Sequence, residues 1–125
     1  MANPIYAPYA RLPKGECYEE YLYAIEISNG VMKVGRTHCP RNRVKQHAKE
    51  IMHDGKSIRR FAVVRTFGTN SFYQERELLM RLNRLATVRP GRLEHFTGVS
   101  FATSAQLMRQ CASREFISLH VRTGA

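Results

Sequence analysis

Residues 21–47 read YLYAIEISNGVMKVGRTHCPRNRVKQH, and this stretch decides the fold. The run Tyr21–Ile27 alternates and is rich in aromatic and β-branched residues, a pattern typical of a half-buried strand. Ser28, Asn29 and Gly30 form a turn signal, and residues 31–37 form a second strand-like run. The stretch therefore begins with a predicted β-hairpin.

A helix is predicted directly after the hairpin. Pro40 cannot donate a hydrogen bond to a strand ladder, but it suits the first turn of a helix. From there, apolar residues recur at helical spacing, at Val44, Ala48 and Ile51. Arg43 and His47 lie four residues apart on the neighbouring stripe, so we expect their side chains to point to one place.

The length of the hairpin loop decides which side chains share a face of the sheet. A two-residue turn would place Glu26 opposite Lys33, whereas a three-residue loop that ends at Gly30 pairs Ile25 with Lys33. Only the second register puts Tyr23 and Lys33 on one face, because side chains alternate along a strand. We predict the three-residue loop.

A third strand and a second helix follow. Asp54 and Gly55 end the first helix, and residues 61–64 predict a third strand that is central or near-central. The second helix is expected at about residues 72–85, with an apolar stripe made by Phe72, Leu78, Leu79, Leu82, Leu85 and Ala86. Together these elements predict an α/β (α+β) domain with a small, three-stranded, mixed or antiparallel sheet flanked by helices.

Glu75 falls in the middle of this apolar stripe. A carboxylate on a buried face is costly unless it is paired, hydrogen-bonded or bound to a cation. A buried salt bridge to one of the many arginines is one explanation. A metal-binding role is the other.

The residues of this stretch carry a resemblance to a known family. Tyr21-Leu22-Tyr23 and Lys33-Val34-Gly35-Arg36-Thr37 resemble the two halves of the signature of the GIY-YIG nuclease superfamily, closest to its small phage and bacterial branch. The resemblance continues through Arg43, His47 and Glu75 to the triplet at residues 94–96. It departs from the family at two points, since the glycine of the first half is absent and Lys33 replaces the tyrosine of better-known members.

The resemblance implies a divalent-metal-dependent endonuclease that hydrolyses phosphodiester bonds in DNA through a single metal ion. Glu75 would hold Mg²⁺ or Mn²⁺, which needs few protein carboxylates because it keeps several waters. Arg43 would stabilise charge on the phosphate, and His47 would either assist proton transfer or orient the attacking water. Tyr23 would act as the base with Lys33 as its positive neighbour, although the general base stays open among Tyr23, Lys33 and His47.

Composition favours a polyanionic partner. The 125 residues carry a formal net charge of +10, and nucleic acid is the usual partner of such a protein. We expect DNA, with RNA left open, and either limited sequence specificity or a homodimer that gains specificity. The cations expected to contact nucleic acid are Arg36, Arg41, Lys45, Arg59 and Arg60.

The chain is expected to form one domain over residues 20–122, preceded by an extended, proline-containing arm over residues 1–19. No apolar run reaches the roughly 20 residues that span a membrane. Neither a disulfide framework nor a zinc site is suggested by Cys17, Cys39 and Cys111. These features favour an intracellular location, and the resemblance implies the cytoplasm of a bacterial or phage-infected cell.

A second function remains open. The missing glycine and the lysine at position 33 are also compatible with a protein that keeps this fold and binds nucleic acid without cutting it, such as a phage regulatory or anti-restriction factor. Metal dependence separates the two hypotheses, because a nuclease needs Glu75 and Mg²⁺ whereas a binding protein needs neither.

Overall fold

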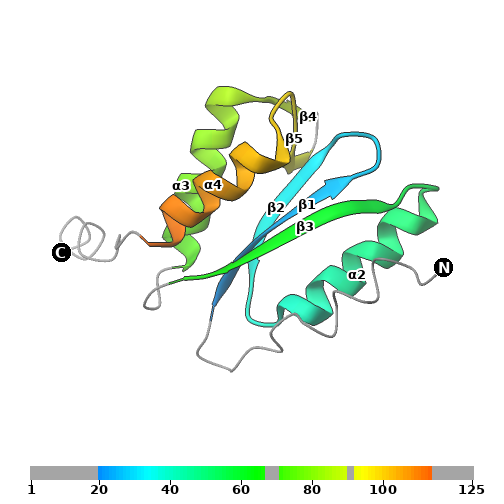
Figure 1. The fold of residues 1–125 in the computed structure, drawn as a ribbon, viewed down its shortest axis with the longest axis horizontal. Helices are drawn as coiled ribbons and strands as arrows, with labels where there is room; N and C mark the ends of the chain where they lie inside the picture. The colour runs from blue at the N-terminus through cyan, green and yellow to red at the C-terminus, as the bar shows by residue number, and fades with distance from the viewer. Residues whose placement is uncertain (1–19, 67–70, 90–91, 114–125) are drawn as a thin grey trace.

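The computed structural model describes residues 20–66, 71–89 and 92–113. Along the chain its elements are β1 (Tyr21–Ile27), β2 (Met32–Thr37), α2 (Pro40–His53), β3 (Ile58–Arg65), α3 (Ser71–Leu85), β4 (Thr87–Arg89), β5 (Arg92–Thr97) and α4 (Phe101–Ala112) (Figure 1). Strands and helices mix along the chain and the sheet is antiparallel, which confirms the α+β class. The predicted arm at residues 1–19 and the end of the predicted domain lie outside the described residues.

The sheet has five strands in the order β3-β1-β2-β5-β4. The expectation of three strands was therefore wrong. β4 and β5 form an antiparallel hairpin that was not predicted, and β5 joins β2 through the pairs Met32↔Phe96 and Lys33↔His95. β3 was expected near the centre of the sheet, but it lies at the edge because β1 takes the position between β2 and β3.

The β1–β2 hairpin has the predicted three-residue loop. Ile25 pairs with Lys33, and Tyr23 pairs with Gly35. The loop is closed by backbone hydrogen bonds from Gly30 to Ile27 and from Ile27 to Val31, and Gly30 has φ +86°, a value that glycine adopts at low cost. Tyr23 and Lys33 therefore share a face.

Helices cover both faces of the sheet. α2 lies on one face, while α3 and α4 lie on the other (Figure 1). The α2 face buries Tyr23, Ile25 and Ile27 of β1, and the opposite face buries Leu22 and Ala24. All seven positions of β1 are consequently buried, so the prediction of a half-buried strand was wrong: a central strand covered on both faces has no solvent side.

The ends of α2 and the buried face of α3 position the side chains of the candidate site. α2 has Pro40 in its first turn and ends at His53, followed by the capping residue Asp54 and by Gly55 with φ +76°. α3 buries Ser71, Gln74, Leu78 and Leu82. Phe72 and Leu85, which were expected in the apolar stripe, are exposed, since the buried stripe follows the α4 and sheet side of the helix.

Five chain segments meet at one end of the sheet. Tyr21, the first residue of β1, pairs with Thr37 at the end of β2 and with Arg65 at the end of β3. α2 begins three residues after β2 ends, at Pro40, and α3 begins at Ser71, after the end of β3. The positive, N-terminal ends of both helices therefore lie at this end, which we call the helix-start end. The opposite end carries the loop at residues 28–30.

None of the helices in the described part of the chain has the length and apolar character needed to cross a bilayer.

Candidate functional site

Tyr23 and His47 form a buried polar pair between the sheet and α2. The Tyr23 hydroxyl lies 2.9 Å from His47 Nε2, and the two residues are 3% and 6% exposed. The hydroxyl lies against the backbone of Gly35, where an added Cβ would come within 2.5 Å of it. Gly35 thus leaves the space in which the tyrosine ring reaches the histidine.

His47 is held in its neutral form. Burial lowers the pKa of the His47 imidazole below its usual 6.5, and the positive charges of Lys33 and Arg43 lower this pKa further. Glu50, one turn along α2, opposes them, with a carboxylate oxygen 3.5 Å from Nδ1. The charge of this imidazole is therefore set by side chains from both β2 and α2.

A polar pocket of about 70 Å³ lies on the other side of His47, toward the loop end of the sheet. Lys33 and His95, which face each other across the β2–β5 pair, both line it. The remaining walls come from the loop and from α2, and the full lining is Ile27, Asn29, Lys33, His47, Glu50, Ile51, Asp54, Lys56 and His95. The predicted site residue Lys33 is thus placed beside His47.

Arg43 lies one turn before His47, in the N-terminal half of α2. It is half-buried, its guanidinium donates to Gln46 over 3.4 Å, and its charge acts on His47. The predicted proximity of Arg43 and His47 therefore holds. Four of the predicted catalytic residues, from β1, β2 and α2, share the α2 face of the sheet: Tyr23, Lys33, Arg43 and His47.

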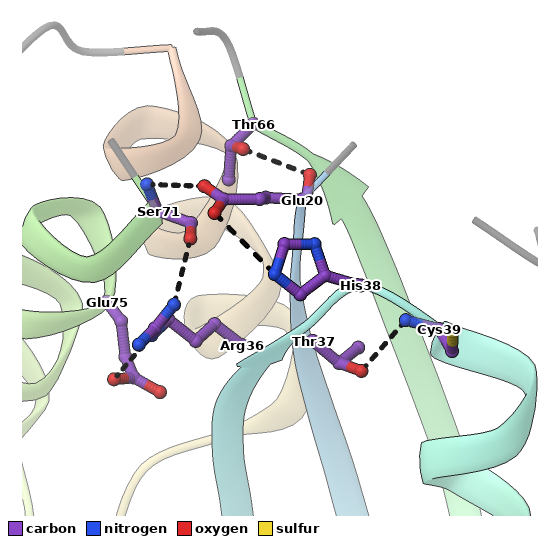
Figure 2. A network of polar contacts seen from close by, with 8 residues as sticks. All are labelled: Glu20, Arg36, Thr37, His38, Cys39, Thr66, Ser71 and Glu75. Atoms are coloured by element: carbon purple, nitrogen blue, oxygen red, sulfur yellow. Dashed lines mark hydrogen bonds and ion pairs between the residues drawn. The ribbon is translucent and has the colours of Figure 1, made fainter. Parts of the chain in front are cut away.

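Glu75 lies near Arg36 of β2 (Figure 2). Arg36 Nε is 3.7 Å from Glu75 Oε1, which is an ion-pair distance and longer than a hydrogen bond. The same guanidinium donates to the Ser71 hydroxyl over 3.4 Å and lies 5.5 Å from the centroid of the Phe72 ring. The Glu75 side chain is 19% exposed, so it lies at the border of the buried stripe rather than in its middle.

A second carboxylate, that of Glu20, lies at the start of α3 (Figure 2). It accepts a hydrogen bond from the Ser71 backbone N–H over 3.0 Å and lies 3.8 Å from His38 Nε2. A carboxylate at a helix N-terminus is favoured by the helix dipole and satisfies a free N–H group. The Glu20 carbonyl also accepts from the Thr66 hydroxyl, so Glu20 joins the starts of β1 and α3 to the end of β3.

The predicted catalytic residues thus belong to two groups. Arg36 pairs with Leu22 across β1 and β2, and Leu22 packs under α3. Arg36 and Glu75 therefore lie toward the α3 face, whereas Tyr23 and His47 lie toward α2. Tyr23 lies against Gly35, the residue next to Arg36 in β2, but the side chains of the two groups project from opposite faces of the sheet. A substrate that contacts both groups would therefore have to span both faces.

The residues present fit one type of divalent metal site. Within residues 20–66, 71–89 and 92–113, no three His, Cys, Asp or Glu side chains are arranged to hold a metal ion. A cage built from protein ligands is therefore not formed there. A magnesium ion held by the Glu75 carboxylate, with water and a substrate phosphate as the other ligands, remains compatible with this arrangement.

The five cations expected to contact nucleic acid lie on separate parts of the surface. Arg41 and Lys45 are on α2, and Arg36 is at the helix-start end. Arg59 donates to the Ser28 carbonyl, and Arg60 pairs with Glu26 over 2.9 Å, which places both at the loop end.

Three residues of these groups were missed in the sequence. Glu50 lies three positions after His47, so the helical spacing that links Arg43 and His47 could have found it. His95 belongs to the triplet at residues 94–96, but its place in the pocket could have been found only with the β2–β5 pairing. Glu20 has no local signal, because its contact with Ser71 spans 51 residues of chain.

No protein-family model matches this chain, and no curated protein or solved structure matches it either.

Proposed function

We propose that this protein is a divalent-metal-dependent endonuclease of the GIY-YIG type that cuts DNA. The observation that carries the proposal is the Tyr23–His47 hydrogen bond, formed over Gly35 and next to Lys33. The sequence signature selects the same four positions. Hydrolysis needs a proton acceptor near the attacking water, and a neutral histidine bonded to a tyrosine can supply one.

Electrostatics at the helix-start end support the same proposal. The N-termini of α2 and α3 both lie there, with Arg36 and Arg43 close by. Helix N-termini and guanidinium groups favour phosphate. In this proposal a backbone phosphate contacts Arg43, and Glu75 holds a Mg²⁺ ion that supplies a Lewis acid for the phosphate oxygens.

A second function has observations of its own. The Glu75 carboxylate already has Arg36 as a cationic neighbour, and Tyr23 is almost completely buried. Both features favour a protein of this fold that binds nucleic acid without cutting it. In either case we place the protein in the cytoplasm of a bacterial or phage-infected cell, with DNA as its partner and a homodimer as its route to specificity.

The two functions are distinguished by metal dependence. Supercoiled plasmid would be incubated with the full chain and Mg²⁺, with and without EDTA, while fluorescence anisotropy measures binding to a DNA duplex in EDTA. Cutting that needs Mg²⁺ supports the nuclease. Binding without cutting supports the second function, and a chain that neither binds nor cuts contradicts both.

A further inference from the structure

We propose that Glu50 is a positioning residue that holds His47 in the tautomer with the proton on Nδ1, so that Tyr23 donates its phenol proton to Nε2. Glu50 is no part of the sequence signature. The effect of Glu50 on catalysis rests on the proposed nuclease function, whereas its effect on the His47 tautomer does not.

The first step is the position of His47 between two groups. Nε2 faces the Tyr23 hydroxyl at 2.9 Å, and Nδ1 faces the Glu50 carboxylate at 3.5 Å. Nδ1 is buried and has no hydrogen bond of normal geometry within the described residues. Glu50 is 60% exposed and lines the same pocket, so a small movement of its side chain or one water in the pocket can complete the contact.

The second step is the number of protons on the ring. An ionised carboxylate can only accept, so a favourable contact with Glu50 requires a proton on Nδ1. A neutral imidazole carries one N–H, and the lowered pKa of His47 keeps the ring neutral near pH 7. Nε2 therefore presents its lone pair to Tyr23, and the phenol is the donor of the 2.9 Å hydrogen bond.

The third step is the surroundings of the ring. Titratable and charged groups face His47 or line its pocket from β1, β2, β5, α2 and the segment after α2: Tyr23, Lys33, Arg43, Glu50, Asp54, Lys56 and His95. Of these, Glu50 is the group whose carboxylate lies at an ion-pair distance from Nδ1. Lys33 and Arg43 disfavour a second proton on the ring but do not select a tautomer.

This direction of donation gives the pair a defined role in hydrolysis. Tyr23 can take a proton from an attacking water only if its own proton moves to Nε2. The water oxygen then bonds to phosphorus, the bond to the departing sugar oxygen breaks, and that oxygen takes a proton from solvent. The imidazolium that forms is stabilised by Glu50, and its loss of one proton to solvent returns the ring to the neutral Nδ1–H tautomer that the contact with Glu50 favours.

The tautomer can be measured by ¹⁵N NMR of the His47 ring in the full chain. We expect Nδ1–H at neutral pH in the wild-type protein, although free imidazole rings favour Nε2–H. Glu50→Ala should shift the ring toward Nε2–H, and Glu50→Gln, which keeps an acceptor, should retain Nδ1–H. Asp54→Ala removes another carboxylate from the same pocket and should leave the tautomer unchanged.

Two results would overturn the proposal: Nε2–H in the wild-type protein, or the wild-type tautomer in Glu50→Ala. If Glu50→Ala did not fold, the wild-type spectrum would still decide. The pH profile of plasmid cutting tests the catalytic consequence, since removing the carboxylate lowers the pKa of His47 and should move the acid limb of Glu50→Ala to lower pH. If His47 carries its proton on Nδ1 but the protein does not cut DNA, the proposed nuclease function is wrong and the role of Glu50 in positioning His47 stands.

Discussion

The Tyr23 hydroxyl and His47 Nε2 lie 2.9 Å apart, so one buried hydrogen bond ties the interior strand β1 to helix α2. This hydrogen bond depends on Gly35, the β2 residue against which the Tyr23 ring packs. Gly35 has no side chain, and the tyrosine ring occupies the space that a Cβ would need.

Gly35→Ala should therefore destabilise the fold and disturb the Tyr23–His47 pair. The new Cβ would lie 2.5 Å from the hydroxyl and 2.8 Å from the ring carbon that bears it, and a buried ring has little room to move. Overpacking of this kind costs about 1–3 kcal/mol of unfolding free energy. Urea denaturation measures this cost. The double variant with Tyr23→Phe, which lacks the hydroxyl, should recover part of it, and full stability in Gly35→Ala would contradict the close approach.

Stability should fall as the pH drops below about 6.5. The pKa of His47 is lowered in the folded state, so the unfolded chain binds more protons between its ordinary pKa of 6.5 and the lower folded value. Stability is therefore complete above this window and is lost as the pH falls through it. Thermal melts from pH 7.5 to 5.5 would measure the slope, and His47→Gln should flatten it. Equal slopes in the two proteins would contradict a buried neutral His47.

Arg36→Gln should strengthen divalent-metal binding by Glu75. The guanidinium competes with a metal ion for the same carboxylate, and a partly exposed pair at 3.7 Å is worth a fraction of a kcal/mol to about 1 kcal/mol. We expect Mn²⁺ affinity to rise about two- to fivefold, as measured by electron paramagnetic resonance. Glu75→Gln should abolish this site. Unchanged or weaker Mn²⁺ binding in Arg36→Gln would show that the pair does not compete with the metal.

The two ends of the sheet should differ in DNA binding. The double variant of Arg41 and Lys45 to Gln removes charge from α2, near the helix-start end. The matched double variant of Arg59 and Arg60 to Gln removes the same charge at the loop end. We expect a larger loss of affinity from the α2 variant, with the slope of log K against log salt reduced by about 0.9 for each phosphate that the variant no longer neutralises. A larger loss of affinity in the Arg59 and Arg60 double variant would place the DNA at the loop end of the sheet.

The sequence predicted the hairpin and its register because both depend on local chemistry. The three-residue loop ends at a left-handed glycine at position 30, and a loop of this length fixes the pairing of Ile25 with Lys33. The order of strands in the sheet depends on contacts between distant segments. For this reason the β4–β5 hairpin was missed and β3 was placed near the centre of the sheet, although its residues were correctly identified as a strand.

The candidate site was likewise predictable only where it depends on local sequence patterns. The spacing on α2 predicted that Arg43 and His47 lie together, and the parity of the hairpin put Tyr23 and Lys33 on one face. The resemblance to the nuclease family was needed to join these two pairs. The position of Glu75 beside Arg36 depends on how α3 docks on the far face of the sheet, which no local pattern determines. Glu20, which contacts the start of α3 from before β1, was invisible for the same reason.

The most direct test of the proposed function compares Glu75→Gln with Glu77→Gln in plasmid nicking with Mg²⁺. Both carboxylates lie on α3, both are partly buried, and both pair with an arginine, Glu77 with Arg81 over 3.0 Å. If Glu75 holds the metal, its loss should slow nicking by at least about a hundredfold, while Glu77→Gln stays near the wild-type rate. Equal rates in the two variants, or no nicking by the wild-type protein, would contradict the single-metal nuclease.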